Sequence, residues 1–326
     1  FMLVPSLREF RPRATTIAAE PELAAPLEVL ADALTRPEPA ARLQQLCGAM
    51  TAKAVEDCSF YRDARLVSLN EVGGDPQRFG VSAAEFHRAA AVRARLWPNT
   101  MTTLSTHDTK RGEDVRARIA VLSQVPGLWS ELVTRWESAV PSPDPMTGLF
   151  LWQNIFGVWP QDGRITEALR GRLHAYTEKA VREAGLRTSW YDQDEEFERA
   201  IHTWVDSVLD GPPAAEMTEL LRRLQPHAHS DALGQKLLAL TTPGIPDVYQ
   251  GTELWEDSLV DPDNRRPVDY AERRAALHRS DHPKLRVVAA ALAARRDRPD
   301  IFLRGGYRPV LATGPAAEHL VAFLRG

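Results

Sequence analysis

Cysteine is scarce in this sequence, with Cys47 and Cys58 as the two examples among 326 residues. Two cysteines cannot form the disulfide framework of a small secreted domain, so we expect a reducing, cytoplasmic environment. Basic residues are not in excess, because 40 Lys and Arg stand against 44 Asp and Glu and give a formal net charge of −4. This balance gives no electrostatic reason to expect nucleic acid or an anionic membrane surface as a partner.

Long apolar runs are missing as well. No segment approaches the roughly 20 consecutive apolar residues that a transmembrane helix needs, and residues 1–13 lack the order of a secretory signal. The chain opens on Phe1 followed by Met2, which indicates that residues were removed or that the chain is a piece of a longer protein. Its length indicates one large domain or two to three smaller ones.

Helical periodicity is abundant. Apolar spacing in residues 17–50 predicts two amphipathic helices that are broken at Pro37–Pro39. Ser82 and Glu85 form a capping-box pattern that begins a helix at 82–96. Most tryptophans of the helical block are expected in the core, with Trp152 and Trp159 as the stronger candidates for exposure. Further helices are expected at 113–123, 127–139, 164–184, 193–209, 214–225 and 284–297.

Strand-like segments are few and short. Thr100–Ser105 has β-compatible residues and fits a short buried strand, and Asp247–Gly251 fits a short strand that ends on glycine. Residues 301–326 contain two alternating runs around Gly and Pro turns, which predicts an antiparallel hairpin. Two parallel strands cannot form a sheet that buries itself, so the rest of that sheet must come from elsewhere.

The first candidate for chemistry is the segment Ser105–Arg111. A strand followed by His107 and Asp108 places an imidazole and a carboxylate at the edge where barrel enzymes build their sites. A capping aspartate beside a surface histidine is the alternative interpretation. Lys110 and Arg111 begin a dense block of mixed charge, which also fits the solvated start of a helix.

The second candidate is residues 53–62, with the polar segment 68–75 behind it. Charged side chains hydrogen-bond sugar hydroxyls, and aromatic faces stack on the C–H side of a sugar ring. A polar loop around a buried tyrosine explains the same composition equally well. The candidate sugar-contacting residues in this segment are Lys53, Glu56, Asp57, Tyr61 and Arg62.

The third candidate is Pro243–Trp255 together with the polar loop that follows it. Gly251 permits close backbone approach, and Glu253 comes just after it as a group that would face substrate. Arg265 belongs to Asp261–Pro267, which faintly resembles a calcium loop but lacks the glycine and terminal glutamate of an EF-hand. We therefore expect no metal and no cofactor.

Together these segments resemble the α-amylase superfamily, which has a strand-seven signature ending in His-Asp and a strand-eight region of the form Pro-Gly-x-Pro-x-x-Tyr-x-Gly-x-Glu. Within that superfamily, the resemblance is to the maltooligosyl trehalose synthases, and it covers residues 40–326. Ala54 and Cys58 depart from the pattern, where Gly and Thr are expected. The segments that carry the resemblance are KAVEDCSFYR, LNEVGGDP, TLSTHDTKRGEDVRAR, PGIPDVYQGTELW and LVDPDNRRPVDY.

The resemblance implies an α/β fold: the second half of a (β/α)₈ barrel with a large helical insertion and the start of a C-terminal antiparallel β-domain. Residues 1–110 would hold a barrel portion with preceding helices and end at the strand-seven motif. Residues 111–235 would be the helical insertion. Residues 236–298 would supply the last barrel strand, an active-site loop and a helix, and 299–326 an incomplete β-domain.

The resemblance also implies a reaction in trehalose biosynthesis, in which the reducing-end α-1,4 bond of a maltooligosaccharide becomes an α,α-1,1 bond. Asp108 matches the third catalytic carboxylate of the family, and His107 matches a histidine that binds a sugar hydroxyl. The nucleophile and the acid/base belong to strands upstream of this sequence. The implied substrate contacts are Lys53, Glu56, Asp57, Tyr61, Arg62, Lys110, Arg111, Glu253 and Arg265.

Because two of three catalytic carboxylates are missing, we expect a fragment that is inactive alone. Its partners would be a maltooligosaccharide and the N-terminal half of the same enzyme, in the same or a companion chain. Two alternatives remain: an amylase-type glycoside hydrolase that releases trehalose or glucose, and a non-catalytic carbohydrate-binding fragment.

Overall fold

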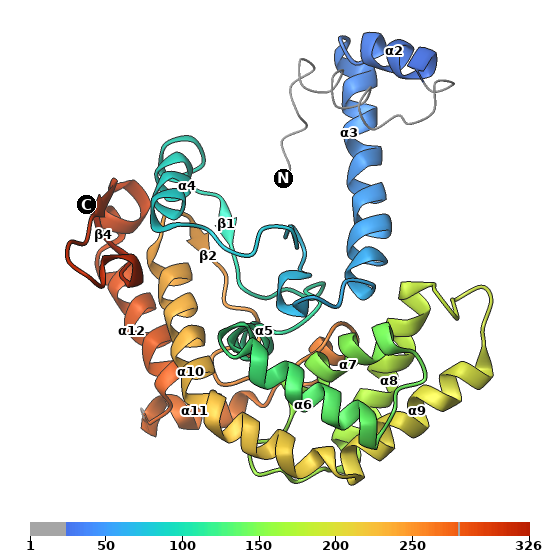
Figure 1. Cartoon of the computed structure of the whole chain (residues 1–326). Coiled ribbons are helices and arrows are strands. Elements are labelled where there is room, and N and C mark those ends of the chain that lie inside the picture. The colour runs from blue at the N-terminus through green and yellow to red at the C-terminus, as the bar shows by residue number, and fades with distance from the viewer. Residues whose placement is uncertain (1–23, 280) are drawn as a thin grey trace. The chain divides into compact units, whose positions relative to one another are not determined.

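The computed structural model describes residues 24–279 and 281–326 (Figure 1). The chain divides into two compact units, Phe1–Tyr61 and Arg62–Gly326. In the described ranges the structure is mostly helical and contains four short strands in two pairs.

The N-terminal unit, as far as it is described, is helical. Its elements are α2 (Ala24–Ala33), α3 (Pro37–Thr51), a π-helical turn η2 (Ala52–Glu56) and a 3₁₀ turn η3 (Ser59–Tyr61). The predicted break near Pro37 is confirmed, and Pro37 begins α3, where a missing N–H leaves no hydrogen bond unmade. The part of the prediction that falls on residues 17–23 lies outside the described residues.

The second unit contains the remaining helices. They are α4 (Ala83–Leu96), α5 (Glu113–Ala120), α6 (Pro126–Ala139), α7 (Pro145–Val158), α8 (Glu167–Ala184), α9 (Glu195–Asp210), α10 (Pro213–Thr241), α11 (Tyr270–Arg279) and α12 (Pro283–Asp297). Short 3₁₀ or π turns lie at Val67–Leu69, Val121–Gln124, Asp263–Arg265, Asp300–Arg304 and Ala317–His319. The capping box predicted at Ser82 and Glu85 is present at the start of α4.

Helix α7 is buried along most of its length, and the sequence pattern does not predict it. Ten of its 14 residues are buried, so the helix has no polar face and no 3.6-residue pattern to detect. Trp152 and Trp159, the stronger candidates for exposure among tryptophans mostly expected in the core, are both fully buried. Gly157 allows α5 to approach closely, because a Cβ there would lie 2.8 Å from Cγ1 of Val115.

Helix α10 is longer than its sequence predicts. The expected helix ends at residue 225, before Pro226, but α10 continues through this proline to Thr241. A proline removes one backbone hydrogen bond and strains one turn, and packing of α10 against α5 and α12 outweighs that cost. The helix therefore crosses the predicted 235/236 domain boundary without a break; the four domain ranges stay predictions.

Strands β1 (Met101–Thr102) and β2 (Ile245–Pro246) pair in parallel, with Met101 opposite Ile245. Parallel pairing of these two distant segments is confirmed, but two details are wrong. Met101 is exposed rather than buried, and the second strand precedes Asp247–Gly251 instead of occupying it. That segment forms a turn in which Gly251 has φ +92°, a conformation that favours glycine.

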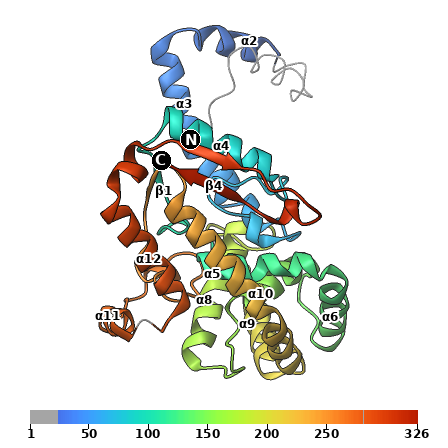
Figure 2. The same ribbon diagram turned by 90° about the vertical axis from the view of Figure 1, so that its left-hand side faces the viewer.

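The chain ends in the predicted antiparallel hairpin, formed by β3 (Tyr307–Val310) and β4 (Ala322–Arg325). Figure 2 shows this hairpin beside α4. The contact includes a 2.6 Å hydrogen bond between the Tyr307 hydroxyl and Nδ1 of His87.

Candidate functional site

The loop Ser105–Arg111 follows β1 and has a fixed backbone. Oγ1 of Thr106 accepts hydrogen bonds from the backbone N–H groups of Asp108 and Thr109 at 3.1 and 3.2 Å. From the loop that follows β2, Nδ2 of Asn264 donates to the carbonyl oxygens of Thr106 and His107 at 3.3 and 2.9 Å. The His-Asp pair is therefore held both by its own turn and by the neighbouring loop.

The Asp108 side chain is 49% exposed, and its Oδ1 lies 3.6 Å from Nζ of Lys110. The Lys110 side chain is 2% exposed, so a buried ammonium lies beside a carboxylate that solvent can reach. The neighbouring His107 is exposed. This arrangement presents an anionic acceptor and an imidazole at the C-terminal end of a parallel strand.

Glu71 stabilises the same loop through hydrogen bonds, a role that the sequence does not predict. Its carboxylate accepts from the backbone N–H groups of Lys110 and Arg111 at 2.7 and 3.2 Å. It also pairs with Nη1 of Arg116 at 3.1 Å. In the sequence, Glu71 belongs to the polar segment 68–75, which predicts sugar recognition and not this structural role.

Arg111 is 1% exposed and joins three segments of the protein. Its Nε donates to Oδ1 of Asn154 at 2.6 Å, and its Nη1 donates to the carbonyl of Asn70 at 3.1 Å. Its guanidinium also lies over the Phe150 ring, 5.5 Å from the centroid. A sugar contact by Arg111 stays a prediction, and the contacts in this structure are structural.

Three other predicted residues lie in the second unit, each with a protein partner. Nε of Arg62 donates to the Ala184 carbonyl at 2.6 Å. Glu253 lies 3.5 Å from Nε of Arg273. The exposed Arg265 lies 3.6 Å from its partner Asp261.

The remaining predicted residues lie in the N-terminal unit. Lys53 and Asp57 form an ion pair one helical turn apart, and Tyr61 is buried. Glu56 ends the π-helical turn η2. Grouping of these four residues with Asp108 stays a prediction.

Behind the loop, four buried charged side chains join α5, α10 and α12. Nζ of Lys284 lies 2.9 Å from Glu113 and 2.6 Å from Asp114, and Nζ of Lys236 lies 2.6 Å from Glu113. The Ser105 hydroxyl accepts from the Glu113 backbone N–H at 3.1 Å and so connects the cluster to the start of the loop.

The charges of this cluster influence each other. Burial raises the pKa of Glu113, but Lys284 and Lys236 more than offset that effect and hold it below the ordinary value. For Asp114, burial prevails over the attraction of Lys284, and its pKa is raised. Burial also lowers the pKa of Lys236. The cluster therefore depends on having both lysines opposite both carboxylates.

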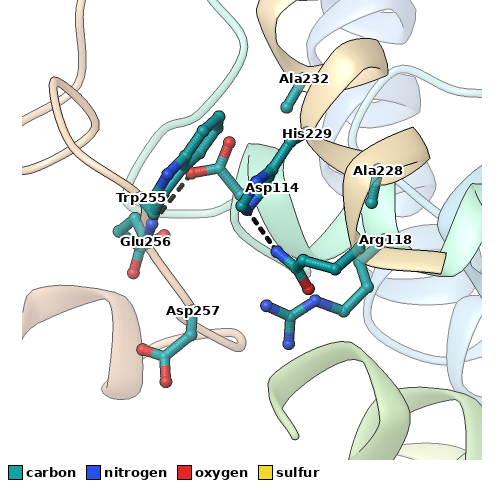
Figure 3. A pocket seen from close by; sticks show the side chains of 9 residues that line it. Asp114, Arg118, Ala228, His229, Ala232, Trp255, Glu256 and Asp257 are labelled. Carbon is teal, nitrogen blue, oxygen red and sulfur yellow. Dashed lines mark hydrogen bonds between the residues drawn. The ribbon is translucent and has the colours of Figure 1, made fainter. Parts of the chain in front are cut away.

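A cavity of about 110 Å³ lies between α5, α10 and the loop after β2 (Figure 3). In it the His229 ring stacks on Trp255, with centroids 4.0 Å apart and planes 2° apart. Oδ1 of Asp114 and Oε1 of Gln225 are buried there without a hydrogen-bond partner among the described residues. The space is large and polar enough to hold several water molecules. The lining residues are Asp114, Arg118, Gln225, Ala228, His229, Ala232, Trp255, Glu256 and Asp257.

Glu256, in the wall of this cavity, has a carboxyl group with a raised pKa. Burial raises its pKa from 4.5 to about 7, despite hydrogen bonds from Ser258, and the nearby Asp257 and Asp114 add to the shift. A Cβ on Gly112 would meet the end of the Glu256 side chain, so a larger residue there would require the Glu256 carboxylate to shift.

We expect Glu256→Gln to stabilise the protein above neutral pH. Because the folded protein binds the Glu256 proton more tightly than the unfolded chain does, this group adds to stability in full below pH 4.5. That stabilisation is lost as the pH rises through about 7. Glutamine resembles the protonated acid, so at pH 8 the free energy of unfolding of the variant should exceed that of the parent by about 3 kcal/mol. Urea unfolding at pH 4.5 and pH 8 measures this; an equal difference at both values would contradict it.

Two negative findings apply to residues 24–279 and 281–326. Their helices do not combine the length and apolar character that a bilayer span requires. Their His, Cys, Asp and Glu side chains form no group of three or more that could hold a metal ion.

Comparisons with known sequences and with solved structures find the same kind of protein. No family model matches the chain. Proteins from two strains of Mycobacterium tuberculosis, both named as maltooligosyl trehalose synthases, are 65% identical over 314 residues. These residues cover 96% of this chain and 41% of each relative.

Solved structures agree. Maltooligosyltrehalose synthase from Arthrobacter ramosus matches 98% of this chain with a TM-score of 0.88 and 46% identity, over 43% of its own chain. A hypothetical maltooligosyl trehalose synthase of Sulfolobus tokodaii matches 91% with a TM-score of 0.78 and 30% identity, over 42% of its chain. The chain is therefore a homologue of maltooligosyl trehalose synthases, and it spans about two fifths of the length of these relatives.

Proposed function

We propose that the chain is the C-terminal part of an intramolecular transglycosidase of trehalose biosynthesis in the cytoplasm. Its substrate is a maltooligosaccharide, and its product carries an α,α-1,1-linked terminal glucose in place of the α-1,4-linked one. The observation that carries the proposal is the accessible Asp108 carboxylate beside buried Lys110, at the end of a parallel strand. Homology to maltooligosyl trehalose synthases supports it.

In this proposal β1 and β2 are the seventh and eighth strands of a (β/α)₈ barrel. Their parallel pairing and adjacent positions support the assignment. Barrel enzymes place their sites at the C-terminal ends of the strands, and the loops that carry Asp108 and Glu253 both leave those ends. The other strands belong to an N-terminal part in the same or a companion chain.

The reaction keeps the configuration of the donor anomeric carbon and therefore needs two displacements. A carboxylate nucleophile first forms a glycosyl-enzyme while an acid protonates the leaving oxygen; the released glucose then attacks through its anomeric hydroxyl. The N-terminal part supplies both groups. Asp108 acts as a third carboxylate that binds sugar hydroxyls and stabilises the oxocarbenium-like transition state, with His107 binding a neighbouring hydroxyl.

Transfer prevails over hydrolysis only where water is kept from the glycosyl-enzyme. The helical block from α5 to α10 supplies a wall for such a closed site. The proposed substrate contacts are Lys53, Glu56, Asp57, Tyr61, Arg62, Lys110, Arg111, Glu253 and Arg265. Three of them, Tyr61, Lys110 and Arg111, are buried in this structure, and the Arg111 guanidinium donates to Asn154 and Asn70.

Product analysis tests the proposal. The chain is completed with the rest of the 65%-identical mycobacterial relative and incubated with maltopentaose. We expect a non-reducing product of unchanged mass, detected as a loss of reducing ends without shorter sugars. Release of glucose or trehalose as the main product would identify a hydrolase instead. Maltopentaose binding without any conversion would identify a carbohydrate-binding fragment.

A further inference from the structure

The loop between α8 and α9 exposes two consecutive aromatic residues. Trp190 is 48% exposed, and the Tyr191 side chain is fully exposed. Leu186, earlier in the loop, is also exposed. Single exposed apolar residues are common on protein surfaces, but two adjacent aromatic rings on one loop form a recognisable feature.

Hydrogen bonds fix the backbone of this loop. The Ser189 N–H donates to the Asp192 carbonyl at 2.9 Å, and Oγ of Ser189 accepts from the N–H groups of Tyr191 and Asp192 at 3.3 and 2.9 Å. At the base of the loop, the buried Thr188 hydroxyl donates to Glu198 at 2.6 Å. The aromatic rings therefore project from a defined turn. A pre-ordered turn reduces the conformational entropy that the loop loses when a ligand binds.

One face of Trp190 is supported from within the protein. The Arg182 guanidinium lies 5.2 Å from the centroid of the indole ring. Arg182 is itself held by Glu198 at 2.7 Å and by Glu178 at 2.7 Å. This support orients the indole while much of its surface remains open to solvent.

Polar groups surround the two rings. Arg187, Asp192 and Gln193 are exposed on the same loop and offer both donors and acceptors. The loop begins at Gly185, a left-handed residue with φ +59° that ends α8. At this point Arg62, a proposed substrate contact, donates to the Ala184 carbonyl, so the loop begins next to one of the proposed substrate contacts.

We propose that Trp190 and Tyr191 form a subsite that binds glucosyl units of a linear α-1,4-glucan. The apolar C–H face of a glucose ring matches an open aromatic face, and its hydroxyls match the flanking charged and amide groups. The choice of glucan as ligand rests on the proposed function. The mixed charge around the two rings and the small apolar area favour a sugar over a protein partner, since stable protein interfaces bury about 800 Å² on each side.

Binding measurements on this chain test the subsite. Maltoheptaose is titrated into the parent chain and the double variant Trp190→Ala/Tyr191→Ala, and binding is followed by calorimetry. We expect the double variant to bind at least about tenfold more weakly, because two stacking contacts are lost. Trp97→Ala/Tyr270→Ala is the matched control, because it removes an exposed Trp and an exposed Tyr elsewhere in the second unit. Circular dichroism verifies that each variant folds.

Unchanged affinity in the double variant, or an equal loss in the control, overturns the subsite. A parent chain that does not bind maltoheptaose overturns it too. The outcome is separable from that of the proposed function. If the completed protein forms no trehalose-ended product while binding still depends on Trp190 and Tyr191, the proposed reaction fails and the subsite stands. If product forms and the double variant converts maltotriose and maltoheptaose like the parent, only the subsite fails.

Discussion

Asp108→Asn should lower kcat for transglycosylation about a thousand-fold in the completed protein, with a much smaller effect on KM. Asparagine keeps the shape of the side chain and its hydrogen-bonding reach but removes the charge. In the role that we propose for Asp108, the lost interaction is strongest in the oxocarbenium-like transition state, where positive charge develops, so the effect falls on kcat. Steady-state assay of non-reducing product from maltopentaose measures both parameters.

Asp210→Asn is the matched control for this variant. Asp210 is also an accessible aspartate of the second unit paired with a basic side chain, Arg170, but it lies at the end of α9. The control should keep full activity. Parent-like kcat in Asp108→Asn would remove Asp108 from the catalytic set, whereas a rise in KM alone would assign it to substrate binding.

Lys284→Met should lower the free energy of unfolding by about 3–5 kcal/mol. The side chain of Lys284 is 0% exposed, and its ammonium contacts both Glu113 and Asp114. Methionine has a similar length but no charge, so the two buried carboxylates would share Lys236 alone. Urea unfolding followed by tryptophan fluorescence at pH 7 gives the free energy.

Two further variants isolate the electrostatic cause. Lys179→Met removes a partly exposed pair with Asp261 and should cost about 1 kcal/mol or less. Adding Asp114→Asn to Lys284→Met should restore part of the lost stability, because one uncompensated buried charge disappears. A cost for Lys284→Met no larger than that for Lys179→Met, or no recovery in the double variant, would show that the ionic cluster does not stabilise the fold.

Much of the local structure could be predicted from sequence because its signals are local. The capping box at Ser82, the C-terminal hairpin and the helix that begins near Pro283 each depend on residues a few positions apart. Helix α7 could not be found in this way, since burial on all sides removes the amphipathic pattern. The continuation of α10 through Pro226 depends on packing against distant helices.

The candidate site also contains parts that the sequence predicts and parts that it does not. The position of Asp108 at a strand end follows from the motif around it, and the structure places the motif there. The groups that hold the loop could not be inferred, because Glu71 and Asn264 act on it from distant parts of the sequence. Lys284 is farther still from its partners, and no residue spacing reveals a pairing that tertiary packing creates.

The amide of Asn264 has a consequence for protein engineering. Because it donates to the backbone of both Thr106 and His107, the loops 105–111 and 261–265 behave as one unit when either is altered. Substitutions in contacting groups are not additive, so libraries that randomise one loop and keep the other constant would discard compatible pairs. The two loops are better varied together in the same library.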